Sequence, residues 1–484
     1  MNKLPINQYL IAPEEQPQLE GNYMVWGGNH LYMHTSLEFA KVQKGEVHII
    51  LIGFILDPFN PKKGNSDIVA GWSDYSELSM FLDAIEKYTG RYLILYSNEK
   101  VKVVLPDATA QREVFYARQN GRLWLASQPH LLKQMLGLQD NDSEFFTSAT
   151  FQKKKERIME LTEVESVSHL LPNHLLKLEA GGAERFFPRD EKLTSGSVDE
   201  SVDVISEYLR QAIHAASLRY KLTQALTGGW DSRVMLAAAK PFAKQIKFFV
   251  IQHENMADTH LDIATPVKLM ARLGILFQVI IEDKEPPGEY AGKVQEATPL
   301  ALNKHLKLLY NFFADLPEKT LNITPVSEVG RAYYKFELEE KGLSGHALAE
   351  LLNYQQYAEV VEAYQNWLSG IKPIAKATNY DVRDLFYWEE RMGNWLANGR
   401  SVMANEVEDF SPFNSHYLLK LMLSVPVRYR DRYKNRLLKK VIKKLWPEAL
   451  VVPVNDNLKY KLIRGMISLG IYKLYKRGQK ALKN

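Results

Sequence analysis

Short apolar runs separated by turn residues fill the first 190 positions of the chain. They cover residues 47–56, 91–96, 101–105, 114–117 and 123–126, and the turn-forming segments SNEK and QNGR separate several of them. This spacing is typical of antiparallel strands. Residues 76–88 instead repeat apolar positions at helical spacing, with Ser76 as the expected N-cap. The pattern predicts a layered α+β domain over residues 1–190.

The pattern changes after a polar stretch at 189–200, RDEKLTSGSVDE, which is typical of an exposed linker. An amphipathic helix is expected at 202–216, followed by apolar strands that end before Thr227 and at 246–251 and 277–281, with helices between them. This alternation predicts a parallel sheet with helices on both faces. We therefore expect an α/β chain whose second domain, 191–484, carries a helical C-terminal part.

The segment LTQALTGGWDSRVMLAAA places two glycines between the first of these strands and a helix. Such a corner can aim backbone N–H groups and a helix N-terminus at an anion, and ligands of parallel sheets bind at this edge. We expect Thr227, Gly228, Gly229 and Ser232 to hold pyrophosphate. A second anion would repel phosphate, so Asp231 is expected to bind Mg²⁺. The plainer interpretation is a corner in which Asp231 or Ser232 only caps the helix.

TGGWDSR resembles the SGGxDS loop of the ATP-pyrophosphatase superfamily, and its surroundings resemble the asparagine synthetase family. GFILD, TGRYLILY, LPDATAQREVFYA, GRLWLASQPHLL and LLPNHLLKL follow the order of segments in the glutaminase half of that family. The resemblance implies an Ntn-hydrolase-like first domain and an adenine-nucleotide α-hydrolase-like second domain. ATP and Mg²⁺ are the cofactors that it implies.

Two departures from the family alter what it implies. Its glutaminases use an N-terminal cysteine as nucleophile, whereas this sequence has Asn2 there and no cysteine at all. We therefore expect no glutaminase activity from the first domain. The second departure is LNITPVSEVGRAYY, at the place of a glycine-rich acidic loop. Ser327 falls at the position of a metal-binding aspartate, and only Glu328 and Tyr333 align with the acidic pair and the closing tyrosine.

The same resemblance supplies the remaining candidate residues. It implies that Glu328 and one of Lys459 and Lys461 serve catalysis, and that Lys434 supports the phosphates; a solvated surface cation is the plainer interpretation of any one lysine. Further candidates near the nucleotide are Val250 beside the adenine, Glu408 as a polar contact, His253 in a structural role, and Asp258 and Asp262 on one helix face.

Composition limits the partners. The net charge of +4 is too small to indicate nucleic acid. The sequence shows no secretory signal and no apolar stretch long enough for a membrane span, so we expect a cytoplasmic protein. The tail after residue 457 has eight Lys or Arg and no acid, with apolar residues at helical spacing. Weak contact with anionic lipid and packing on its own domain both stay open, as does a homodimer.

These observations lead to a first hypothesis of an ATP-dependent amide ligase. It would adenylate a small carboxylate, release pyrophosphate and transfer ammonia or an amine to the acyl group. The alternative is a catalytically impaired homologue that binds nucleotide or a partner enzyme, which the altered acidic loop favours. A tRNA-modifying ATP-pyrophosphatase is a third interpretation, which the lack of cysteine and of a strongly basic face disfavours.

Overall fold

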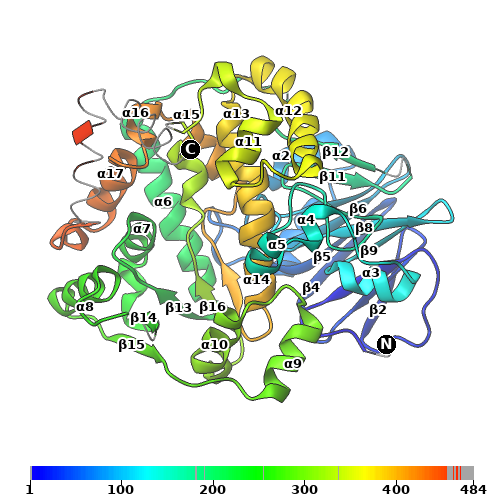
Figure 1. The fold of residues 1–484 in the computed structure, drawn as a ribbon, viewed down its shortest axis with the longest axis horizontal. Helices are drawn as coiled ribbons and strands as arrows, with labels where there is room; N and C mark the ends of the chain where they lie inside the picture. Colours follow the sequence, from blue (N-terminus) through cyan, green and yellow to red (C-terminus); the bar gives the residue numbers. More distant parts are fainter. Residues whose placement is uncertain are drawn as a thin grey trace.

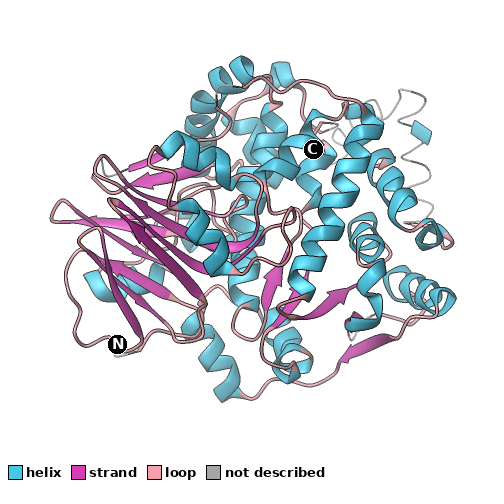
Figure 2. Ribbon diagram, turned by 180° about the vertical axis from the view of Figure 1, so that it is seen from behind, coloured by secondary structure: helices cyan, strands magenta, loops and turns pink. Residues whose placement is uncertain are grey.

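The computed structural model describes residues 3–179, 182–189, 191–253, 256–335, 337–454, 462, 465, 466 and 469. We call residues 3–189 the N-terminal half and residues 191–454 the C-terminal half. Figure 1 shows the two halves side by side, and Figure 2 shows strands concentrated in the first half and helices in the second.

Over the described residues, the N-terminal half contains two antiparallel sheets of six strands each. The first has the order β10 (Val167–His169), β8 (Phe115–Gln119), β9 (Arg122–Ala126), β1 (Tyr9–Ala12), β3 (Asn29–Met33), β2 (Asn22–Trp26). The second has the order β12 (Gly182–Arg185), β11 (His174–Lys177), β7 (Lys102–Pro106), β6 (Thr89–Ser97), β5 (Val47–Leu56), β4 (Phe39–Lys44). All five strands expected from the sequence are confirmed, as β5 to β9, while β1 to β4 and β10 to β12 lie outside those five ranges.

Alternation of side chains along the strands explains the layers. In β5, Ile50 and Ile52 pack between the two sheets, whereas Ile49 and Leu51 pack against the helices outside. The outer layers of the half contain α1 (Asn65–Trp72), α2 (Leu78–Ile85), α3 (Pro129–Leu136), α4 (Glu144–Thr147) and α5 (Ala149–Lys154). The layered α+β prediction is therefore confirmed. Ser76 is not the cap of α2, since Glu77 occupies that position without a side-chain cap bond.

The C-terminal half is built on a parallel sheet, as predicted. Its order within the described chain is β15 (Phe277–Glu282), β14 (Ile246–His253), β13 (Lys221–Ala225), β16 (Thr320–Ile323), β17 (Glu408–Phe410). One face packs on α6 (Val198–Ser217), α7 (Trp230–Ala238), α8 (Leu261–Leu273) and α17 (Arg436–Leu445). The other packs on α9 (Gly288–Ala297), α10 (Asn303–Asn311) and α14 (Ala397–Met403).

The remaining helices form the helical C-terminal part. They are α11 (Gly345–Leu352), α12 (Ala358–Thr378), α13 (Val382–Phe386), the π-helical segment Tyr387–Leu396, α15 (His416–Ser424) and α16 (Val427–Arg430). No helix of the described residues combines the length and apolarity that crossing a membrane requires.

Strand order defines one special edge of the parallel sheet. From β13 the chain moves outward through β14 and β15, then returns to the opposite side of β13 as β16. The topological switch point therefore lies between the carboxyl ends of β13 and β16, where open α/β sheets bind their ligands. Residues 226–232 follow β13 and residues 324–331 follow β16. We call these two loops the switch site.

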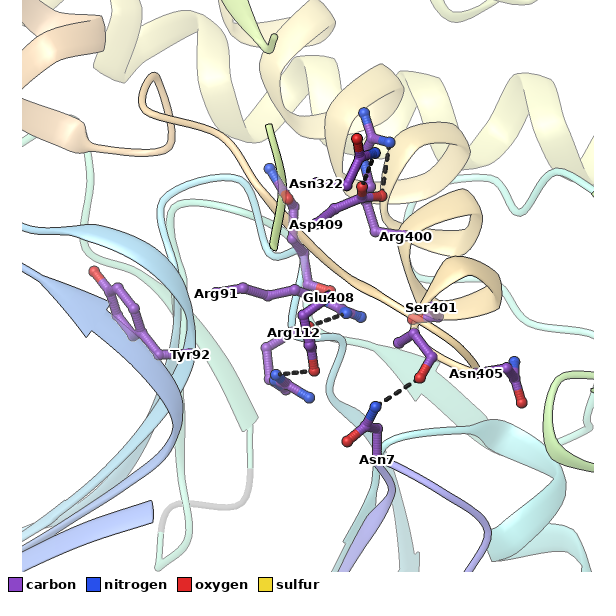
Figure 3. Close-up of polar contacts among 12 residues, drawn as sticks. Asn7, Arg91, Tyr92, Arg112, Asn322, Arg400, Ser401, Asn405, Glu408 and Asp409 are labelled. Atoms are coloured by element: carbon purple, nitrogen blue, oxygen red, sulfur yellow. Dashed lines mark hydrogen bonds and ion pairs between the residues drawn. The ribbon is translucent and has the colours of Figure 1, made fainter. Parts of the chain in front are cut away.

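Buried carboxylates of the C-terminal half join it to the N-terminal half. Glu408 on β17 accepts hydrogen bonds from Arg91 (2.5 Å) and Arg112 (2.8 Å), as Figure 3 shows. Glu389 in the π-helical segment pairs with Arg185 across the same boundary. We call this contact, formed by β17 and residues 387–396 against the N-terminal half, the seam.

Candidate functional site

Hydrogen bonds of the Thr227 and Ser232 hydroxyl groups close the loop that contains Gly228 and Gly229. The Thr227 N–H donates to Ser232 Oγ (3.1 Å), the two hydroxyl oxygens are 3.2 Å apart, and the Gly229 N–H donates to Thr227 Oγ1 (3.4 Å). Helix α7 starts directly after Gly229, at Trp230. The predicted strand, turn and helix are confirmed, and the helix N-terminus lies at the switch point, where its dipole favours an anion.

Gly228 is glycine because another segment approaches it closely. An added Cβ would lie 3.2 Å from both Asp262 Oδ1 and the Leu261 carbonyl oxygen. Neither Gly228 nor Gly229 has a positive φ, so the loop does not need left-handed backbone. Gly228 is therefore required by the close contact between the loop and the start of α8, and not by the backbone conformation of the corner.

The Gly228 N–H already binds a carboxylate. It donates to Asp262 Oδ1 at 3.1 Å, and Asp262 belongs to the first turn of α8. Asp258 lies before that helix and accepts from Gln252 (2.7 Å), so the two acids do not share a helix face as expected. The loop thus binds an anion in this structure, and the anion is supplied by the chain itself.

Asp231 is paired with an arginine from the neighbouring loop. Arg331 Nη1 donates to Asp231 Oδ1 (2.7 Å) and Oδ2 (2.5 Å), and the Ser327 hydroxyl donates to Oδ1. Both residues belong to the 3₁₀ turn Ser327–Arg331 that follows β16. The two loops of the switch site are therefore joined by an ion pair between residues that are 100 positions apart.

As they are paired in this structure, these residues do not fit a divalent metal ion on Asp231, and the expected Mg²⁺ site stays a prediction. Both oxygens of Asp231 are engaged by hydrogen-bond donors, and the hydroxyl of Ser327 stands where an anionic ligand would be needed. Among the residues described, no three His, Cys, Asp or Glu side chains gather as a metal-binding group. A guanidinium already supplies the positive charge that Asp231 requires.

Glu328 lies in the same turn, where burial and the neighbouring Asp231 raise its pKa to about 7, against the opposing effect of Arg331. The side chain stays partly accessible. It is therefore the acid of the switch site that changes charge near neutral pH. The resemblance named Glu328 but gave no reason to expect this titration.

Other candidates lie away from the switch site or in structural roles. Glu408 points into the seam, where Arg91 and Arg112 hold its pKa below the usual range despite its burial, so its expected role as a polar nucleotide contact is corrected. Val250 is a buried residue of β14 opposite Val279. His253 pairs with Glu282 at 2.7 Å, in agreement with the expected structural histidine.

The candidate lysines are placed only in part. Lys434 lies in the turn before α17, and the neighbouring Arg432 carbonyl accepts a hydrogen bond from Arg331 (3.2 Å), so this turn adjoins the switch site. Lys459 and Lys461 lie outside the described residues, as does Asn2. Sequence reasoning missed Arg331, which directly follows Gly330, because the resemblance described this loop through its glycines, its acids and its closing tyrosine.

Comparison with models of protein families and with curated protein sequences gives no match. Among solved structures, the chain is similar to NMN synthetase from Francisella tularensis, at 14% identity over 41% of this chain and 94% of that one, with a TM-score of 0.23. It is also similar to glutamine PRPP amidotransferase from B. subtilis, at 9% identity over 66% and 75%, with a TM-score of 0.24. NH3-dependent NAD synthetase from Campylobacter jejuni subsp. jejuni NCTC 11168 has 15% identity over 41% and 94%, with a TM-score of 0.21. At such TM-scores, none of these similarities carries an argument about this chain.

Proposed function

We propose that the switch site binds the phosphate chain of ATP and uses it to adenylate a carboxylate for amide formation. The observation that carries this proposal is the Gly228 N–H bound to a carboxylate oxygen at the switch point, beside a helix N-terminus. Phosphate oxygens use the same donors. In the ATP complex, a phosphate oxygen replaces the Asp262 carboxylate on the Gly228 N–H.

The reaction has two balanced steps. A substrate carboxylate oxygen attacks the α-phosphorus, the bond from that phosphorus to the α,β-bridging oxygen breaks, and pyrophosphate leaves with that oxygen. Ammonia or an amine then attacks the acyl carbon, AMP leaves, and the nitrogen loses a proton. The backbone donors, the hydroxyls of Thr227 and Ser232 and the guanidinium of Arg331 stabilise charge on the phosphates. Glu328 accepts the proton, for which a pKa of about 7 is suitable.

Nucleotide binding by calorimetry on the whole chain tests the first part of this function. Gly228→Ala adds a Cβ where the loop meets Asp262 and Leu261, so we expect ATP binding to weaken by about tenfold or more. Gly292→Ala is the matched control, because a Cβ there meets nothing within 4 Å, and it should bind as the wild type does. Pyrophosphate release with a panel of carboxylates and amines then tests ligation.

A second function is favoured by the pairing of charges within the switch site. The Gly228 N–H binds Asp262, and Asp231 pairs with Arg331, so groups of the chain itself occupy the loop. This arrangement is expected of a homologue that keeps the fold and binds a partner enzyme. The same calorimetry separates the two functions. A well-folded chain that binds no ATP, even when Asp262 is replaced by alanine, would contradict the ligase and support the scaffold.

A further inference from the structure

Arg331 places a fixed positive charge at the switch site, where neighbouring residues hold its guanidinium group. Its Nη1 holds both oxygens of Asp231, and its Nη2 donates to the Arg432 carbonyl oxygen at 3.2 Å. Its buried Nε has no hydrogen-bond partner among the described residues. The guanidinium is therefore fixed by two loops and keeps N–H groups that make no hydrogen bond to the described residues.

The chemistry of guanidinium suits this position. It keeps its charge at any pH that the fold tolerates, and its planar donors match phosphate oxygens. A divalent metal, by contrast, requires free anionic oxygens, and the carboxylate of Asp231 is engaged by Arg331 and Ser327. The pair with Asp231 also favours the charged form of Arg331 and offsets the cost of its burial.

We propose that Arg331 is the resident cation of the switch site, so that nucleotide binding does not depend on a divalent metal held by Asp231. This inference rests on the proposed binding of ATP. Asp231 is then a positioning residue, whose carboxylate holds the guanidinium beside the loop. The neighbouring Arg432 is a separate cation, since it stacks on the rings of Tyr333 and Tyr433 and pairs with Glu337.

Binding of Mn²⁺ without nucleotide tests this assignment by electron paramagnetic resonance. Wild type should bind no Mn²⁺ through Asp231, so that its titration matches that of Asp231→Asn. Arg331→Ala uncovers the carboxylate and should gain a Mn²⁺ ion, which the double variant Arg331→Ala/Asp231→Asn loses again. Arg432→Ala is the control, because it removes a nearby cation without uncovering Asp231, and it should gain none. A Mn²⁺ ion that wild type binds and Asp231→Asn loses would overturn the proposal.

Calorimetry of ATP binding with Mg²⁺ and with excess EDTA gives the second test. Wild-type affinity should change by less than about threefold on chelation, whereas Arg331→Gln should bind about tenfold more weakly in EDTA and recover with Mg²⁺. Loss of wild-type binding on chelation overturns the role of Arg331 and leaves the proposed function standing. No binding in either buffer contradicts the proposed function itself. Circular dichroism shows whether each variant is folded. The comparison of wild-type ATP affinity in Mg²⁺ and in EDTA does not depend on any variant.

Discussion

The seam and the switch site use the same chemical pair, a carboxylate and an arginine, for different purposes. In the seam, Glu408 is 18% exposed and meets two arginines from the other half, whose side chains are 3% exposed. In the switch site, Asp231 is 21% exposed and meets one arginine of its own half, whose side chain is 11% exposed. Removal of Glu408 would leave the charges of two buried arginines without their bound carboxylate. The pair of Asp231 and Arg331 lies at the open edge of the sheet, where a ligand can replace one of its contacts. The seam charges therefore hold the two halves together, whereas the switch-site charges are the ones that we propose to bind a ligand.

The geometry of the seam supports this distinction. In the π-helical segment, a Cβ at Gly393 would lie 2.5 Å from Pro172 Cδ, so the two halves pack in close contact there. Trp388 Nε1 donates to the Ala108 carbonyl oxygen across the same boundary (2.7 Å). π-Helical turns are rare, and this one aims consecutive large and charged side chains at the N-terminal half. A half that is predicted to lack glutaminase chemistry is therefore still an integral part of the core.

The largest expected effect comes from breaking the seam. Glu408→Ala leaves Arg91 and Arg112 buried together without the carboxylate that they both bind, which should lower the free energy of unfolding by about 3–5 kcal/mol. Chemical denaturation measures this change. Asp74→Ala is the control, because its pair with Lys44 is about 70% exposed on both sides and should contribute less than about 1 kcal/mol. Equal effects of the two changes on the free energy of unfolding would show that the buried ion pair stabilises the fold no more than the exposed one.

A smaller effect, a gain in ATP affinity, is expected when Asp262 is removed from the glycine loop. Asp262→Ala removes the carboxylate that competes for the Gly228 N–H, so ATP should bind about tenfold more tightly, a gain of about 1.4 kcal/mol. Calorimetry measures the affinity. Asp258→Ala serves as control, since that acid bonds Gln252 and not the loop. Weaker binding by Asp262→Ala would show that this acid supports the nucleotide site and does not occupy it.

The smallest effect concerns pH. Because the pKa of Glu328 is raised to about 7, the side chain is mostly neutral below that pH and negative above it. A negative Glu328 repels the phosphates, so ATP affinity should fall by about threefold between about pH 6 and about pH 8. Glu328→Gln should lack this contribution, and the difference between the two pH profiles cancels the titration of ATP itself. Identical profiles would place Glu328 out of reach of the ligand.

Local sequence pattern was sufficient for the long buried strands, although the four-residue β1 was missed despite its complete burial. Strands β5 and β6 contain long apolar runs because both of their faces are covered, and β13 to β15 alternate with helices because parallel strands need crossovers. The short strands β2 and β4 were missed because half of their side chains face water. β16 and β17 are four and three residues long, which is too short for their pattern to identify them as strands.

The sequence by itself therefore determined the two classes of layer and the placement of the TGGWDS corner between a strand and a helix, since both depend on neighbours within a few residues. Tertiary structure alone decided the partners of the charges. Arg331 meets Asp231 across 100 positions, and Glu408 meets Arg91 across 317, because strand order brings those loops and strands together. No local pattern encodes that order, which is chosen by the packing of the whole core.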